Sequence, residues 1–145
     1  MDIKENIKKL AKNFAPDIIA NRRHLHSNPE LSFEEHKTSA FVFSKLVEYG
    51  FDPQKGIGGT GVVALIEGRN PGRKVIALRA DMDALPIVEQ NDIPYKSLNE
   101  GVMHACGHDV HTSSLLGAAR ILQEIKGSFE GTVKLIFQPG EEKIP

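Results

Sequence analysis

The first 26 residues carry the hydrophobic spacing of a helix. Their apolar positions recur every three or four residues, at Ile3, Ile7, Leu10 and Phe14, which places them on one helical face. Pro16 has no backbone N–H to donate inside a helix. We therefore predict an amphipathic helix that Pro16 interrupts and that resumes over residues 17–26.

A second helix is predicted after a polar break and before Gly50, a residue that readily adopts the left-handed conformation of a helix end. Ser32 is followed three residues later by Glu35, which matches a capping box. In such a box the two side chains satisfy backbone N–H groups at the start of the helix. The apolar residues expected on its inner face are Phe41, Val42, Leu46 and Val47.

Three later segments are continuous apolar runs: residues 62–68, 74–80 and 131–137. Each is short and rich in branched residues, as buried strands are. Residues 109–126, between the second and third runs, have the spacing of a helix. Helices therefore alternate with apolar strands, and the predicted fold class is α/β.

The glycines of residues 56–61 fit the dinucleotide-binding spacing G-x-G-x-x-G letter by letter. That motif requires a strand before the glycines and a helix after them. Here the glycines precede an apolar strand, so we interpret the segment as a flexible turn and reject a dinucleotide site.

Composition narrows the partners and the location. The 145 residues are 40% hydrophobic and 26% charged, with a formal net charge of -1, which predicts a soluble globular protein without a nucleic-acid or anionic-membrane partner. No apolar run approaches the roughly 20 residues that span a bilayer. The N-terminus has no apolar signal core, and a single cysteine permits no intrachain disulfide. We therefore expect a cytoplasmic location.

The chemically active side chains concentrate in residues 101–114, GVMHACGHDVHTSS, just before the helix predicted at 109–126. This segment holds the only cysteine, Cys106, together with three histidines, His104, His108 and His111. Two other histidines, His24 and His26, are expected on a helix surface or in packing.

Two acidic pairs follow strands: Asp81 and Asp83 after the second, and Glu141 and Glu142 after the third. Alone, each pair would be interpreted as a solvated turn. In open α/β sheets, however, ligands bind at the carboxyl ends of the strands. Both pairs and the Cys106 segment are therefore expected at one edge of the sheet.

Thiolate, imidazole and carboxylate together suit zinc or a related first-row ion. A catalytic metal also needs a base beside its water, and two adjacent glutamates can divide the roles of ligand and base, because consecutive extended residues point opposite ways. The competing hypothesis makes Cys106 a nucleophile with a histidine base, but it leaves both acidic pairs without a role.

Four segments occur in the order and spacing of a known group: residues 22–39, 78–87, 103–119 and 137–142. With them, the chain resembles the N-terminal part of the N-acyl-amino-acid amidohydrolases, such as hippurate hydrolase, indole-acetyl-amino-acid hydrolases and N-acetyldiaminopimelate deacetylase. These belong to the aminoacylase and carboxypeptidase family of two-metal peptidases. The resemblance implies a phosphorylase/hydrolase-like α/β fold with a mixed sheet flanked by helices.

The resemblance also implies particular roles. Cys106, His108 and Glu142 match metal ligands, Glu141 matches the general base, and Asp83 matches a catalytic acidic residue that supports the metal centre. It leaves the roles of Asp81, His104 and His111 open. The implied reaction is hydrolysis of the amide bond of an N-acyl amino acid with two divalent ions, zinc or manganese, with cobalt or nickel as alternatives.

Members of this group are more than twice as long as this chain. They carry two further histidine ligands downstream and an inserted dimerisation domain, and they are homo-oligomers. Residues 1–145 would then be the N-terminal portion of the catalytic domain. We expect such a portion to be inactive alone and to have an unpaired sheet edge prone to self-association. The alternative is a non-catalytic remnant that binds a metal or a partner, which an activity assay would distinguish.

Overall fold

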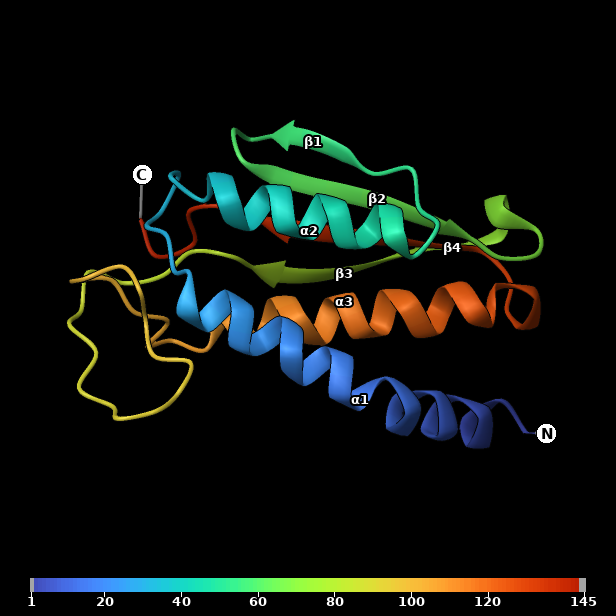
Figure 1. Ribbon diagram of the computed structural model, residues 1–145. Coiled ribbons are helices and arrows are strands. Elements are labelled where there is room, and N and C mark those ends of the chain that lie inside the picture. The colour runs from blue at the N-terminus through green and yellow to red at the C-terminus, as the bar shows by residue number, and fades with distance from the viewer. Residues whose placement is uncertain (1, 144–145) are drawn as a thin grey trace.

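The computed structural model describes residues 2–143 as one layered α/β unit (Figure 1). Its main elements in chain order are α1 (Ile3–Ser27), α2 (His36–Glu48), β1 (Gln54–Ile57), β2 (Gly61–Glu67), β3 (Val75–Asp81), α3 (His108–Glu124) and β4 (Thr132–Gln138). Two short 3-10 turns, Pro71–Arg73 and Lys126–Ser128, lie before β3 and after α3. The predicted α/β class is confirmed.

The four strands form one mixed sheet in the order β1-β2-β4-β3. β1 pairs antiparallel with β2, and β2 antiparallel with β4. β3 and β4 run parallel, with Leu78 opposite Leu135 and Asp81 opposite Gln138. The carboxyl ends of β3 and β4 therefore lie side by side, which places the residues that follow them at one edge of the sheet.

Helices α2 and α3 cover one face of the sheet, and α1 packs against α3 (Figure 1). The core between them is built from fully buried side chains of both layers, including Val42, Leu46, Val62, Leu116, Leu135 and Phe137. Burying a side chain of this size stabilises the fold by about 1.5–3 kcal/mol. The other face is open: Leu65 is 50% exposed between buried Ala64 and Ile66.

β3 forms one edge of the sheet, and no strand within residues 2–143 pairs with its outer side. Its apolar residues are unusually accessible for a strand: Val75 is 59%, Ile76 47% and Leu78 36% exposed. The predicted unpaired edge is therefore present in the structure.

Pro16 does not interrupt the first helix, so that prediction was wrong. α1 is continuous over 25 residues with Pro16 inside it, and it changes direction along its length (Figure 1). A proline removes one backbone hydrogen bond and bends a helix. α1 contacts α3 on both sides of Pro16: Arg120 lies over the ring of Phe14, and Ile18 packs against Gly117.

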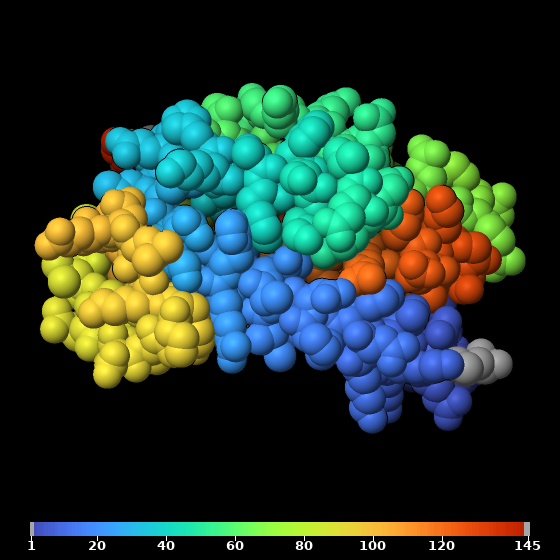
Figure 2. Space-filling model, viewed as in Figure 1, coloured from blue at the N-terminus to red at the C-terminus, as the bar shows by residue number. Residues whose placement is uncertain are grey.

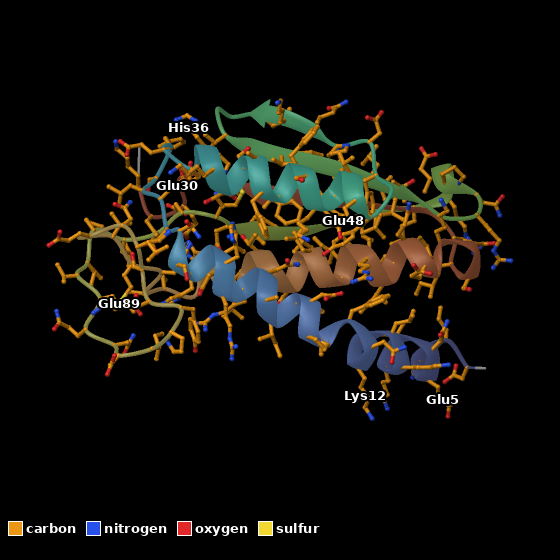
Figure 3. All side chains as sticks on the ribbon, in the orientation of Figure 1. Glu5, Lys12, Glu30, His36, Glu48 and Glu89 are labelled. Atoms are coloured by element: carbon orange, nitrogen blue, oxygen red, sulfur yellow. The ribbon has the colours of Figure 1, made fainter. Side chains whose placement is uncertain are left out.

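The capping box was also wrong. α2 begins at His36, and Glu35 occupies its N-cap position, but neither the Glu35 nor the Ser32 side chain makes a capping hydrogen bond. The backbone N–H groups of Lys37 and Thr38 donate instead to the Glu30 carboxylate, at 3.0 and 2.6 Å. Figure 3 shows Glu30 beside the start of this helix. Ser32 and Glu35 are thereby free to bind elsewhere.

The glycine-rich segment is a turn, as predicted, but it belongs to a hairpin whose first strand was missed. β1 is four residues long and exposed throughout, with Ile57 as its one apolar side chain, so it has no hydrophobic pattern. Gly58 and Gly59 adopt positive φ angles in the turn between β1 and β2, and Gly56 does so within β1, where the pairing with β2 shifts register. A strand, not a helix, follows the glycines, consistent with rejecting a dinucleotide site.

Within residues 2–143, no helix combines the length and the apolar character needed to cross a membrane.

The long segment between β3 and α3 gathers at one end of the molecule, in yellow beside the end of α1 (Figure 2).

Candidate metal centre

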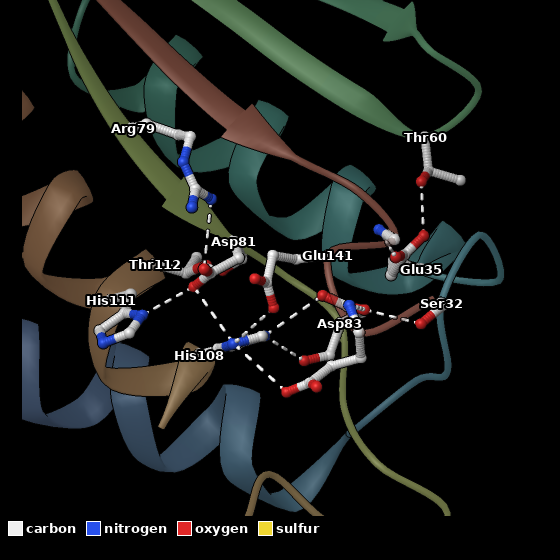
Figure 4. A network of polar contacts seen from close by, with 12 residues as sticks. Ser32, Glu35, Thr60, Arg79, Asp81, Asp83, His108, His111, Thr112 and Glu141 are labelled. Atoms are coloured by element: carbon white, nitrogen blue, oxygen red, sulfur yellow. Dashed lines mark hydrogen bonds and ion pairs between the residues drawn. The ribbon is translucent and has the colours of Figure 1, made fainter. Parts of the chain in front are cut away.

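The residues predicted to form a site come together at the edge where β3 and β4 end (Figure 4). Asp81 is the last residue of β3, and Asp83 follows it. Glu141 and Glu142 follow β4, and His108 is the first residue of α3. Because β3 and β4 are parallel neighbours, the residues that follow them lie side by side at this edge. The start of α3 brings His108 to the same place.

His108 is the centre of the cluster. Its side chain is 3% exposed, and its Nδ1 lies 2.8 Å from the backbone oxygen of Asp83 and 3.2 Å from the Asp83 carboxylate. A carbonyl oxygen can only accept, so Nδ1 carries the proton. Nε2 faces the opposite side of the ring.

Three carboxylates converge on that second nitrogen. The distances from Nε2 of His108 are 3.5 Å to Glu142 Oε1, 3.6 Å to Asp81 Oδ1 and 3.6 Å to Glu141 Oε2. A hydrogen bond between nitrogen and oxygen spans roughly 2.7–3.2 Å. Two ligand atoms of a tetrahedral ion with bonds of 2.0–2.2 Å lie about 3.3–3.6 Å apart. The spacing therefore matches that of ligands around an ion more closely than that of direct hydrogen bonds.

Cys106 completes one group of ligand atoms. Those of Cys106, His108 and Glu142 all lie within 4.8 Å of one another. Oε1 of Glu142 is buried and accepts no hydrogen bond from residues 2–143, a costly state for a carboxylate that a bound cation would relieve. The donor set of sulfur, nitrogen and oxygen fits a first-row divalent ion.

Asp81 and His111, whose roles the sequence left open, form a second group with His108, again within 4.8 Å. Asp81 accepts from His111 Nδ1 at 2.7 Å and from Arg79 at 3.2 Å. Burial acts to raise the pKa of Asp81, but the His111 hydrogen bond and the nearby His108 together lower it below its usual value. Asp81 is thus held as a carboxylate beside His108.

Asp83 supports the cluster from behind. It is 1% exposed, and its Oδ2 accepts from the Ser32 hydroxyl at 2.7 Å and from the Glu142 backbone N–H at 2.8 Å. Burial acts to raise the pKa of Asp83, but these hydrogen bonds bring it below its usual value. Asp83 contacts the ring nitrogen of His108 that points away from the other carboxylates, so it orients the imidazole.

His104 joins neither group. It is buried, and neither of its ring nitrogens has a hydrogen-bond partner in the described part of the chain. Desolvation by burial lowers the pKa of His104 to about 4, so the ring is neutral near pH 7.

Histidines of α1 serve in packing, in line with the sequence interpretation. His24 stacks on Phe41 with ring centroids 4.3 Å apart. His26 is buried, with Nδ1 2.8 Å from Asp109 and Nε2 2.9 Å from Glu89. The partners of His26 were not foreseen, because they lie 63 and 83 residues away along the chain.

Sequence comparison places this geometry in a family. Residues 77–145 match the family model described as Peptidase family M20/M25/M40. An N-acyl-L-amino acid amidohydrolase of Geobacillus stearothermophilus is 49% identical over 98% of this chain and 38% of that protein. A hippurate hydrolase of Campylobacter jejuni is 51% identical over 85% of this chain and 31% of that protein.

Structural comparison agrees. The Bacillus subtilis YXEP protein, described as a dinuclear metal-binding peptidase from the M20 family, has a TM-score of 0.86 and 47% identity, covering 90% of this chain and 36% of that one. Residues 77–145 thus form part of an M20 peptidase domain, and nearly the whole chain is similar to members of that family. The chain spans little more than a third of the length of these relatives.

Proposed function

We propose that this chain supplies part of a two-metal active site that hydrolyses the amide bond of N-acyl amino acids. The observation that carries the proposal is the convergence of three carboxylates on Nε2 of His108 at 3.5–3.6 Å. The substrate class rests on the names of the relatives, an N-acyl-L-amino acid amidohydrolase and a hippurate hydrolase.

Cys106, His108 and Glu142 are the proposed ligands of one ion. The thiolate of Cys106 suits zinc, and the surrounding carboxylates would also accept manganese; cobalt and nickel use the same donors. The proposal of two ions rests on the dinuclear description of the YXEP protein. Asp83 would keep the lone pair of His108 Nε2 directed at the ion, as a hydrogen-bonded partner commonly does for a ligating histidine.

When bound, the ions polarise the substrate carbonyl and make the attacking water more acidic. Glu141 is the proposed general base. Its side chain is 40% exposed, against 22% for Glu142, yet its carboxylate still reaches His108. A carboxylate that borders both the site and solvent can take a proton from water and deliver it to the leaving amine.

The thiol-hydrolase alternative fits less well. The Glu142 carboxylate beside Cys106 raises the pKa of its thiol, whereas a nucleophilic cysteine depends on a lowered pKa. That alternative also gives no role to the carboxylates around His108.

Substituting Glu141 and Glu142 one at a time tests the proposal. The variants are made in the longest reading frame that contains this sequence and are assayed with hippurate and N-acetyl amino acids. We expect Glu141→Gln to keep its metal and lose turnover by about 10²–10⁴-fold, the usual worth of a general base. Glu142→Gln should lose metal as well, and Glu48→Gln on the surface of α2 should change neither.

Wild-type turnover should also disappear with a chelator and return with zinc or manganese. Chelator-resistant turnover would contradict the metal mechanism, and metal loss in Glu141→Gln alone would reverse the two assignments. A chain of residues 1–145 is expected to be inactive; robust turnover by it would show that no further residues are needed.

The other expectations stay predictions. These are a cytoplasmic location, homo-oligomeric assembly, the lack of a nucleic-acid partner, and the assignment of residues 1–145 to the N-terminal portion of a catalytic domain.

A further inference from the structure

Glu35 is a buried acidic residue that lies against the loop carrying Glu141 and Glu142. We propose that it is a positioning residue: its carboxylate holds the backbone at Gly140, so that the two glutamates face His108. This inference rests on the proposed roles of Glu141 and Glu142.

The surroundings of Glu35 are unusual for a glutamate. Its relative exposure is 0%, and it pairs with no cationic side chain among residues 2–143. Its Oε1 accepts the backbone N–H of Gly140 at 2.7 Å, and its Oε2 accepts the hydroxyl of Thr60 at 2.6 Å (Figure 4). Burying a carboxyl group without a cation costs stability, so a merely space-filling role would be met better by an apolar residue.

Residues near Glu35 in the chain also contact the loop at Gly140 or the Asp83 side chain that binds it. The ring of Phe33 packs so closely on Gly140 that a methyl group at Gly140 would overlap it. Phe33 itself has a φ of 64°, a strained conformation for a bulky residue that persists only where its surroundings impose it. Ser32 donates to Asp83 at 2.7 Å, on the oxygen that also accepts the Glu142 N–H.

The loop is therefore fixed on both sides of Glu141. Glu35 holds the preceding residue, Gly140, and Asp83 holds the following one, Glu142. Gly140 has a φ of 62°, so this is where the chain turns from β4 toward the site. A misplacement of about 1 Å can lower a rate roughly 10²-fold. Losing the Gly140 anchor should thus act mainly on turnover through Glu141.

A double-mutant cycle separates positioning from general stabilisation. Glu35→Ala should lower kcat about 100-fold with KM nearly unchanged, whereas Thr60→Ala, which removes only the other partner of Glu35, should cost less than about threefold. Glu35→Gln keeps an acceptor for Gly140 and should restore most of the rate. In the Glu141→Gln background, Glu35→Ala should cause no further loss of residual turnover.

A second readout needs no activity. Exchange of the Gly140 amide hydrogen, followed by NMR, should speed up in Glu35→Ala and stay slow in Thr60→Ala. Equal losses of turnover in both backgrounds, or unchanged exchange at Gly140, would overturn the inference. If Glu35→Ala does not fold, Glu35→Met takes its place, because it keeps the side-chain volume and removes the acceptor for Gly140. Exchange at Gly140 should then be fast in Glu35→Met and slow in Glu35→Gln, and equal exchange in the two would overturn the inference. An inactive or chelator-resistant wild type would contradict the proposed function, while the Gly140 exchange would still test the anchor.

Discussion

Two buried histidines beside the start of α3 face carboxylates in different ways. The side chains of His26 and His108 are each 3% exposed. Both nitrogens of His26 lie 2.8–2.9 Å from carboxylate oxygens, whereas Nε2 of His108 lies 3.5–3.6 Å from three. The two histidines are equally buried, but the carboxylates beside His26 are 1% exposed, whereas those that face Nε2 of His108 are 9–40% exposed and lie farther from the ring. The direct hydrogen bonds of His26 join separate elements of the fold, whereas the longer spacing around Nε2 of His108 supports the proposal that this site binds an ion.

The His26 cluster fastens the segment between β3 and α3 to the helices. Glu89, labelled in Figure 3, lies in that segment and accepts His26 at 2.9 Å and the backbone N–H of Ser97 at 2.6 Å. Asp109 in α3 accepts His26 from the other side, and Arg22 lies 2.9 Å from the same oxygen. The cluster therefore joins α1, α3 and the loop that leads to Cys106.

The largest predicted effect is on stability. His26→Gln removes a partner from two buried carboxylates, and breaking a buried pair in this way costs about 3–5 kcal/mol. Urea unfolding followed by circular dichroism measures the loss. His36→Gln, at an exposed position of α2, is the matched control and should unfold like the wild type. A small loss for His26→Gln would mean that the cluster does not hold the fold.

A smaller effect is expected on metal affinity. Cys106→Ser removes a proposed ligand, so the zinc affinity should fall strongly. Replacing a residue that only orients a ligand lowers metal affinity about 10–100-fold, and the loss for Cys106→Ser should exceed that range. Competition with a chromophoric chelator gives the affinity. Ser114→Ala, on the exposed side of α3, should leave it unchanged. Unaltered zinc affinity in Cys106→Ser would remove Cys106 from the ligand set.

The third prediction is a pH dependence of stability. Burial acts to raise the pKa of Glu89, but the hydrogen bonds from His26, Ser97 and Asn91 lower it to about 2 from an ordinary 4.5. A depressed pKa adds stability that is fully present above pH 4.5 and is lost as the pH falls toward 2. Glu89→Gln should therefore flatten the decline of unfolding free energy across that window. An unchanged slope would show that Glu89 is not the titrating group.

Most of the candidate site was predictable from the position of its acidic residues directly after apolar strands. Asp81, Asp83, Glu141 and Glu142 follow apolar runs, and the ends of neighbouring parallel strands must meet at one edge. Strand β1 was missed because its four residues, with a single apolar side chain at Ile57, are too few to show a hydrophobic period; its pairing with β2 comes from the hairpin turn.

The contacts that support the site could not be predicted from local sequence patterns. Ser32 and Glu35 have the spacing of a capping box, yet Ser32 binds Asp83 51 residues away and Glu35 binds Gly140 105 residues away. Likewise, Pro16 is a local helix breaker, and only packing on α3 explains why α1 continues. Contacts of this kind depend on the assembled fold, so neighbouring residues carry no signal for them.

The most direct test of the central contrast measures metal content and stability in two variants, His108→Gln and His26→Gln. Both variants are made in the longest reading frame that contains this sequence. Elemental analysis after dialysis gives the ions bound per folded molecule, and urea unfolding of the metal-free proteins gives the stability. We predict that His108→Gln loses metal while its metal-free form unfolds nearly like the metal-free wild type. His26→Gln should keep its metal per folded molecule and lose stability. Full metal content in His108→Gln, or equal metal loss in both variants, would contradict the account.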